Sequence, residues 1–393
     1  MHIAFLTPEF PHPKVRASAG IGTSIKNLIE GIQNVDSVSS SFKEACVHQE
    51  LKISVFVYGQ TETTSWSENN ITFHLIEHKK YRLGGFIRYR RYVNKYINRV
   101  IKRDAINLIE APDWTGITAY MKFSIPLVIR LHGTDAYFCN LEGREQKKKN
   151  YHLEMKALLG ADLITSVSKF TALETARIFN ISNPIEVIHN AIDVSFFKPS
   201  KVKPKEDTIL YFGSVIRKKG VLELAKSFKK VLDKKPMATL IYLGKDVRDV
   251  KEGLSTKQLI QDVLGKEHTV NVMFVSQVPY AKVKSYIGEA SVICLPSHAE
   301  AFPMTWLEAM AMAKPMVTSN VGWASEVMIH KKTGLTVNPN KIDELTEALL
   351  FMLENVKEAS AYGKEAREHL ITNFKPAEIA LQNLAFYQKA IKA

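Results

Sequence analysis

The stretch SVICLPSHAEAFPMTWLEAMAMA, residues 291–313, changes character twice along its length. Its opening SVICL is a continuous apolar run, which predicts a strand buried on both faces. PSHAEAFP then holds two prolines and predicts a loop, and MTWLEAMAMA predicts a helix. A strand, a loop and a helix in this order form the repeating unit of doubly wound α/β sheets.

The same alternation of strand-like and helix-like patterns runs through the rest of the chain. The predicted strands are 2–6, 52–58, 71–76, 106–110, 126–132, 162–166, 185–188, 208–213, 238–244, 270–275, 291–295 and 315–318. Helical patterns stand between them, for example at 23–33, 86–103, 220–233 and 341–354. We therefore predict an α/β protein built on doubly wound parallel sheets.

The segment Lys198–Lys205 interrupts this material, because it is polar, holds two prolines and has no apolar run. It predicts a boundary between two Rossmann-like domains, residues 1–198 and 206–375. Two such domains leave a central cleft between them, and the carboxyl ends of both sheets can face a ligand there.

The composition is that of a folded protein with excess positive charge. The 393 residues are 46% apolar, and 53 Lys and Arg against 40 Asp and Glu give a formal charge of +13. This excess favours an anionic partner and leaves nucleic acid, an anionic membrane surface and a phosphorylated ligand open.

Three features bear on the compartment. The cysteines, Cys46, Cys139 and Cys294, form no CxxC pair and no disulfide framework, which favours a reducing environment. The N-terminal apolar run follows no basic region and meets Pro8, so it predicts a strand and not a signal peptide. No window approaches the roughly 18 apolar residues of a membrane span. We expect a cytoplasmic protein.

The loop-to-helix junction at 302–305 is a candidate anion site, since a helix N-terminus presents unpaired N–H groups and a positive dipole end. Glu300 precedes it and Glu308 follows it, and each carboxylate could accept hydrogen bonds from hydroxyl groups. The alternative is that Glu300 is a helix-entry acid and Glu308 a solvated one, and the spacing alone does not exclude it.

The whole segment resembles a known family. EAFPMTWLE, from Glu300 to Glu308, resembles the E-x7-E motif of retaining family 4 glycosyltransferases, which have the GT-B fold. Other segments resemble motifs of that family in the right order. They are ASAGIGTSIKNL (17–28), RLHGTD (130–135), ADLITSVSKF (161–170), VIHNAIDVSFFKP (187–199) and KKTGLTVNP (331–339). The resemblance also implies that the last helix, within 376–393, joins the first domain.

The resemblance implies a role for each matching residue. Glu300 lies beside the reacting carbon of the transferred sugar, and Glu308 binds the ribose hydroxyls of the nucleotide. His132 hydrogen-bonds the donor sugar. The diphosphate is held by Phe302, Pro303, Met304 and Thr305, with Gly20 and Gly22 allowing close approach of the first loop.

The segment ILYFGSVIRKKG, residues 209–220, resembles a motif that carries an Arg and a Lys for the diphosphate. Lys219 matches the Lys, but Ser214 stands at the position of the Arg. Two explanations remain open: Arg217 supplies the second cation, or the phosphates are less neutralised.

No Asp-x-Asp occurs in the chain, so we expect no metal and no cofactor. A nucleotide diphosphate sugar would be the co-substrate, and Lys219, Arg217 and backbone N–H groups would stabilise its leaving phosphate. Retention by front-face attack and retention through a carboxylate nucleophile both stay open.

Residues 79–103 hold ten Lys or Arg and no acid. Arg88, Arg91, Lys95 and Arg99 follow one stripe of the helix predicted here, opposite an apolar stripe. Three interpretations compete: a solvated face, contact with anionic lipid or a lipid-linked acceptor, and nucleic acid. We favour the first two, because the chain contains no recognised nucleic-acid module.

These observations predict a glycosyltransferase acting on a lipid-linked or cell-surface glycan of the lipopolysaccharide, O-antigen or capsule type. A peripheral position on the inner face of the membrane agrees with the basic stripe. One alternative is a catalytically weak nucleotide-sugar-binding protein, and a second is a basic nucleic-acid-binding protein. A dinucleotide oxidoreductase is disfavoured, since no G-x-G-x-x-G follows a predicted strand.

Overall fold

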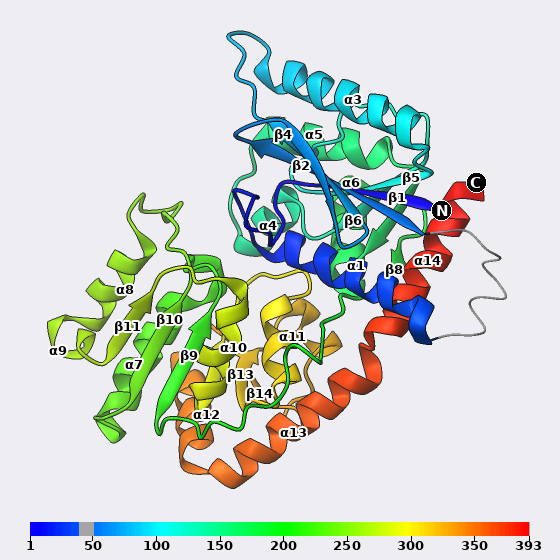
Figure 1. Ribbon diagram of the computed structural model, residues 1–393. Helices are drawn as coiled ribbons and strands as arrows, with labels where there is room; N and C mark the ends of the chain where they lie inside the picture. The colour runs from blue at the N-terminus through cyan, green and yellow to red at the C-terminus, as the bar shows by residue number, and fades with distance from the viewer. Residues whose placement is uncertain (39–50, 393) are drawn as a thin grey trace. The chain divides into compact units, whose positions relative to one another are not determined.

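The computed structural model describes residues 1–38 and 51–392, so Cys46 lies outside the described residues. The chain divides into two compact units, Met1–Ala191 with Lys375–Ala393, and Ile192–Phe374 (Figure 1). The division falls at Ala191, and the Lys198–Lys205 segment lies within the second unit.

Among the described residues, the first unit forms an eight-stranded sheet in the order β3-β4-β2-β1-β5-β6-β7-β8. All neighbouring strands are parallel except β3 and β4. The strands are β1 His2–Thr7, β2 Lys52–Gln60, β3 Thr64–Glu68, β4 Ile71–Glu77, β5 Leu108–Pro112, β6 Leu127–Leu131, β7 Leu163–Ser166 and β8 Glu186–Val187. Strand order reverses between β1 and β5, which is where α/β sheets bind ligands at their carboxyl edge.

The sequence patterns missed β3. Its residues TSWSE are mostly exposed and show no apolar run, because the strand lies at the edge of the sheet. It pairs with β4 through a tight turn in which Asn69 and Asn70 have φ values of 51° and 61°. Asparagine tolerates this left-handed conformation, and a turn of this kind closes a hairpin.

The helices of the first unit are α1 Gly20–Val38, α3 Gly85–Asp104, α4 Asp135–Glu142, α5 Lys148–Leu159, α6 Lys169–Phe179 and α14 Pro376–Lys392. Helix α14 comes from the end of the chain and lies beside α1 (Figure 1). A Cβ on Gly31 of α1 would lie 3.3 Å from the Pro376 carbonyl oxygen, so the small residue allows close packing of the two helices.

A buried polar cluster also attaches α14 to the sheet. Arg130 on β6 donates to both carboxylate oxygens of Glu110 on β5, at 2.8 and 2.9 Å. From α14, the Tyr387 hydroxyl donates to Glu110 at 2.7 Å, and the Asn383 side-chain oxygen accepts from Arg130. All four side chains are buried, so each charge is compensated by the ion pair and by hydrogen bonds.

The second unit forms a six-stranded parallel sheet, within the described residues, in the order β11-β10-β9-β12-β13-β14. The strands are β9 Thr208–Phe212, β10 Thr239–Leu243, β11 Val272–Val275, β12 Val292–Leu295, β13 Met316–Ser319 and β14 Leu335–Val337. The strand order reverses between β9 and β12, so the loops after these strands adjoin the ligand-binding position of the fold. The predictions lacked β14, whose three residues are too short for a pattern.

The helices of the second unit cover this sheet. They are η1 Arg217–Lys219, α7 Val221–Lys234, α8 Thr256–Leu264, α9 Lys266–Thr269, α10 Tyr280–Glu289, α11 Met304–Ala311, η2 Gly322–Glu326, α12 Ile342–Glu354 and α13 Val356–Asn373.

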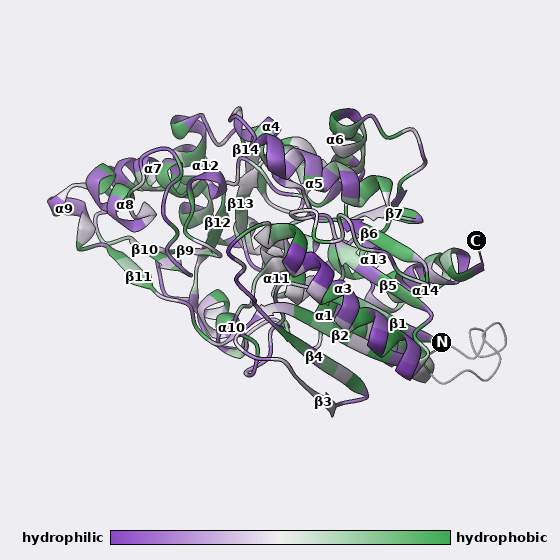
Figure 2. Ribbon diagram, turned by 90° about the horizontal axis from the view of Figure 1, so that it is seen from above, coloured by the Kyte–Doolittle hydropathy of each residue, from purple (hydrophilic) through white to green (hydrophobic). Residues whose placement is uncertain are grey.

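Hydropathy follows the layers within each unit. Hydrophobic residues dominate strands such as β1, β2 and β4, whereas α3 carries many hydrophilic residues along its length (Figure 2). None of the helices in the described part of the chain has the length and apolar character that a membrane crossing requires.

Candidate functional site

The loop after β12 and the short helix η1 after β9 bring two predicted site residues together. Lys219 Nζ lies 2.9 Å from Glu300 Oε1, and the Ser297 hydroxyl donates to the same oxygen at 3.2 Å. Glu300 is 9% exposed, so the pair is largely shielded from bulk water. A shielded ion pair at the strand-order reversal is a pre-formed polar site.

The glycine after β9 keeps this site open. Gly213 has φ +130°, which few residues other than glycine adopt. A Cβ added to it would lie 3.7 Å from Lys219 Nζ and 3.8 Å from Thr305 Cγ2. The Tyr211 hydroxyl donates to the Ser214 carbonyl at 2.6 Å and holds the turn. Gly213, Lys219 and the start of α11 therefore meet at one place.

Helix α11 begins beside this place without a side-chain cap. Pro303 precedes the helix and makes no capping hydrogen bond, and its first turn contains no acid. The N–H groups of that turn thus add partial positive charge next to the Lys219 ammonium. Thr305, in this first turn, lies near Gly213, as does Lys219. The diphosphate role of residues 302–305 stays a prediction.

Glu308 lies on the same helix and is buried, with 4% of its surface exposed. The alternative of a solvated acid is therefore wrong for Glu308. Its Oε1 accepts a hydrogen bond from the Tyr280 hydroxyl at 2.8 Å. Burial raises the pKa of Glu308 to about 7, against the opposing effects of Tyr280 and the Lys219 charge. Sequence reasoning missed Tyr280, whose position after Pro279 carries no recognisable signal.

Arg217 is not part of this group. Its Nε donates to Asp249 Oδ1 at 2.7 Å and its terminal nitrogen to Glu252 Oε1 at 2.5 Å. One explanation for the missing cation at Ser214 was that Arg217 supplies it. In the structure, the Arg217 guanidinium is already paired with two carboxylates, which disfavours this explanation. Sequence patterns do not indicate this pairing, because the loop 246–253 that carries both acids follows a different strand, β10.

In the first unit, His132 directly follows β6. Its backbone N–H and that of Gly133 donate to the two carboxylate oxygens of Asp113, both at 3.0 Å. Burial and the nearby Arg130 charge lower the pKa of His132 to about 3, so the imidazole is neutral at physiological pH. Burial raises the pKa of Asp113 to about 7 despite these bonds. Asp113 is a positioning residue that sequence reasoning missed, although an acid directly after a strand was the available signal.

The two glycines of the first loop differ. A Cβ on Gly22 would lie 2.6 Å from the Glu9 carbonyl oxygen, whereas nothing lies within 4 Å of one on Gly20. The Gly22 N–H donates to the Glu9 carboxylate at 3.1 Å. Gly22 is thus required for close packing of the chain, and the phosphate role of both glycines stays a prediction.

The basic stripe of α3 is exposed. Arg88, Arg91, Lys95 and Arg99 all face solvent. Arg90, between them, is buried instead and donates to the carbonyl groups of Phe86, Thr115 and Gly116. The partner of the exposed stripe stays a prediction.

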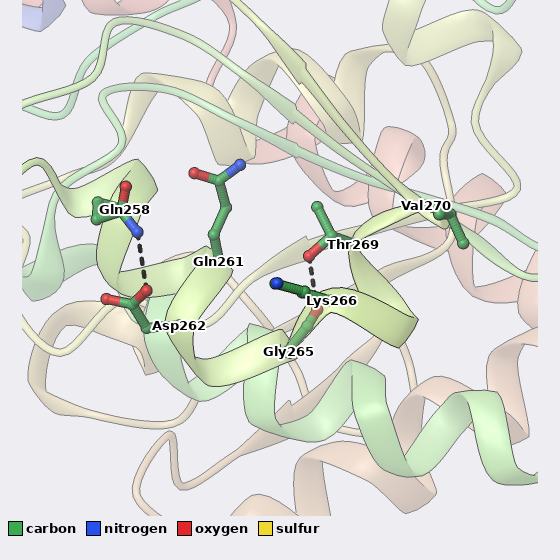
Figure 3. Close-up of a pocket in the computed structure, with 7 residues that line it drawn as sticks. All are labelled: Gln258, Gln261, Asp262, Gly265, Lys266, Thr269 and Val270. Atoms are coloured by element: carbon green, nitrogen blue, oxygen red, sulfur yellow. Dashed lines mark hydrogen bonds between the residues drawn. The ribbon is translucent and has the colours of Figure 1, made fainter.

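A separate hollow of about 490 Å³ lies on the second unit, at α8 and α9 (Figure 3). Gln258 and Asp262 line it and hydrogen-bond each other at 2.8 Å. It contains none of the predicted site residues and no catalytic group. Within the described ranges, no three His, Cys, Asp or Glu side chains are grouped so as to hold a metal ion.

Each of the two units is an α/β fold on a mostly or wholly parallel sheet, and the second has the Lys219–Glu300 pair and the start of α11 at its strand-order reversal. These features define a two-domain α/β protein. Comparison with known proteins specifies the family. Residues 194–369 match the model of "Glycosyl transferases group 1", and residues 44–196 match that of "Glycosyltransferase Family 4". The two matches span most of the chain, which belongs to these glycosyltransferases.

Curated relatives agree with this assignment. The chain is 27% identical to an uncharacterized glycosyltransferase of Methanocaldococcus jannaschii, over 62% of this chain and 65% of that protein. The match thus spans just under two thirds of that relative's length. It is 26% identical to the α-maltose-1-phosphate synthase of Mycolicibacterium smegmatis, over 75% of this chain and 81% of that one.

Solved structures show the same fold. Sucrose-phosphate synthase from Thermosynechococcus elongatus superimposes with a TM-score of 0.78 at 18% identity, covering 99% of both chains. HepE from Anabaena, solved in complex with UDP and glucose, gives a TM-score of 0.70 at 17% identity, over 98% and 99% of the two chains. The fold is therefore GT-B.

Proposed function

We propose that the protein transfers a sugar from a nucleotide diphosphate sugar to an acceptor hydroxyl with retention of configuration and without a metal ion. One observation carries the proposal: the Lys219–Glu300 pair adjoins Gly213 and the uncapped start of α11. Positive charge held in place is what a departing diphosphate needs, because negative charge develops on it in the transition state.

The proposal gives each site residue the role that the resemblance implied. Lys219 and the backbone around Phe302–Thr305, at the start of α11, neutralise the diphosphate. Glu300, released from Lys219 by the bound phosphate, faces the sugar, and Glu308 accepts hydrogen bonds from the ribose hydroxyls. His132 is neutral and orients the donor sugar through hydrogen bonds. Front-face attack and a covalent intermediate both fit this arrangement.

We further propose a lipid-linked or cell-surface glycan of the lipopolysaccharide, O-antigen or capsule type as acceptor. The exposed cations of α3 support it, since they suit an anionic lipid surface or a phosphorylated acceptor. The proposal includes a position in the cytoplasm, at the inner face of the membrane. Nucleic acid is not part of the proposal.

Thermal shift with UDP, GDP, ADP, CMP and dTDP, without added metal, tests the donor site. A nucleotide at 100 times its dissociation constant stabilises the protein by about 2.7 kcal/mol. Lys219→Ala and Glu308→Ala are expected to abolish the shift, and Glu354→Gln, on the exposed end of α12, to keep it. A metal-free panel in which no nucleotide stabilises the protein contradicts the proposal.

The second candidate is a nucleotide-sugar-binding protein with weak catalysis. The ion pairs of Arg217 with Asp249 and Glu252 favour it. With Arg217 engaged and Ser214 in place of the Arg, fewer positive charges surround the diphosphate. Hydrolysis of the donor by the wild type that disappears in Glu300→Ala would exclude it.

A further inference from the structure

The diphosphate site lacks a cation at Ser214, and the structure shows which residue stands opposite that position. Strands β9 and β10 pair in parallel, with Phe212 opposite Leu243. Beyond the strand ends, an isolated bridge sets Val215 opposite Asp246. The register is the same at both points, so Ser214 lies opposite Lys245.

Backbone hydrogen bonds hold this alignment beyond the strands. The Gly213 N–H donates to Leu243 at 2.9 Å, the Val215 N–H donates to the Lys245 carbonyl at 2.9 Å, and the Val247 N–H donates to Val215 at 3.1 Å. Both segments lie beyond their strand ends, and this alignment brings the Lys245 backbone next to the position at which the family's motif carries its Arg.

Two glycines lie between this lysine and Lys219. A Cβ on Gly244 would lie 1.9 Å from the Gly213 carbonyl oxygen, so the two glycines are in direct contact. Gly213 in turn adjoins Lys219 Nζ. Backbone without side chains, flanked by a lysine on either side, allows a phosphate to approach closely.

Lys245 is available for a ligand. Its side chain is exposed, and it takes part in no ion pair within residues 1–38 and 51–392. The neighbouring Asp246 has other partners: it accepts from the Ser255 hydroxyl at 2.6 Å and from the Lys257 N–H at 2.9 Å, at the start of α8. Arg217 is held by Asp249 and Glu252.

We propose that Lys245 supplies the second cation for the donor diphosphate, in place of the Arg that Ser214 replaces. This inference rests on the proposed function. It makes Lys245 a binding residue, with Lys219 on the other side of the glycine pair. The site would thus keep its second positive charge, supplied from the segment after β10 and not from the one after β9.

Titration calorimetry with UDP, GDP and ADP, and with the corresponding nucleosides, tests this. For the diphosphate that the wild type binds, Lys245→Ala is expected to raise the dissociation constant about tenfold, as for loss of one charge-assisted hydrogen bond. Binding of the nucleoside should stay unchanged. Lys245→Arg keeps most of the affinity. Adding Ser214→Arg to Lys245→Ala restores it. Lys251→Ala, an exposed lysine of the same loop, serves as the matched control.

The outcomes separate the inference from the function. Equal affinity of Lys245→Ala and Lys251→Ala, with a clear loss in Lys219→Ala, overturns the role of Lys245 and leaves the donor site standing. Equal losses for nucleoside and diphosphate also overturn it, because they indicate a structural effect. Failure of all three diphosphates, and of CMP and dTDP as well, to bind the wild type removes the proposed function itself.

Discussion

Replacing Glu308 by Gln is expected to stabilise the nucleotide-free protein while it destroys nucleotide binding. Burial raises the pKa of Glu308 from 4.5 to about 7. The folded state thus holds the proton more tightly than the unfolded state does. Stability from this group is present in full below about pH 4.5, falls as the pH rises to about 7 and stays low above it.

The magnitude follows from the same values. Each tenfold change in proton affinity is worth about 1.4 kcal/mol, so the difference between 4.5 and about 7 corresponds to about 3 kcal/mol above pH 7. Glu308 is 4% exposed, so screening by water reduces this little. Gln has the same shape and can still accept from the Tyr280 hydroxyl. The substitution removes the buried charge and replaces the second acceptor oxygen, the one left for the ribose hydroxyls, by an NH2 donor.

Scanning calorimetry of Glu308→Gln at pH 5 and pH 8.5 provides the assay, with Glu354→Gln as the exposed control. At pH 8.5 the transition of the second unit should rise by about 6–12 °C, and at pH 5 by much less. UDP, GDP or ADP, whichever binds wild type, should no longer shift it. A variant that is less stable than wild type at pH 8.5, or equally shifted at both pH values, refutes the reasoning.

Three further substitutions have defined outcomes. Asp113→Ala leaves the N–H groups of His132 and Gly133 without their acceptor and should lower the unfolding free energy in urea by about 2–5 kcal/mol. Donor turnover should fall at least tenfold, because the backbone that carries His132 loses its support, and unchanged turnover would contradict this. Arg217→Ala should leave the dissociation constant for UDP, GDP or ADP unchanged in calorimetry. The melting temperature should drop, because the buried Asp249 loses its ion pair and keeps only the N–H groups of Lys251 and Glu252. Tyr387→Phe removes a donor from Glu110 and should destabilise the first unit by about 1–2 kcal/mol in urea; a neutral result would show that the cluster does not hold α14.

Much of the fold was predictable because it depends on local patterns. Continuous apolar runs predicted β9, β10 and β12, each of which is a buried or mostly buried parallel strand. The polar edge strand β3 has no such run, and its pairing depends on a turn at Asn69 and Asn70. Edge position is a property of the assembled sheet, so no window of sequence contains it.

The candidate site was predictable only in part. The motif identified Glu300, Glu308 and Lys219, and the structure joins the first and third in an ion pair. Burial raises the pKa of Glu308, and the hydrogen bond from the Tyr280 hydroxyl on α10 opposes that rise. The proton affinity of an acid is set by its surroundings, which are contributed by other elements.

The sequence by itself determined the α/β alternation, the family and the residue types that the chemistry needs. Only the tertiary structure decided which charges meet: Arg217 pairs with Asp249 and Glu252, and Lys245 stands opposite Ser214. The physical reason is that the apolar patterns that predict strands and helices extend over only a few neighbouring residues. Electrostatic partners are chosen by strand order and register, which bring distant segments of the chain within a few ångströms.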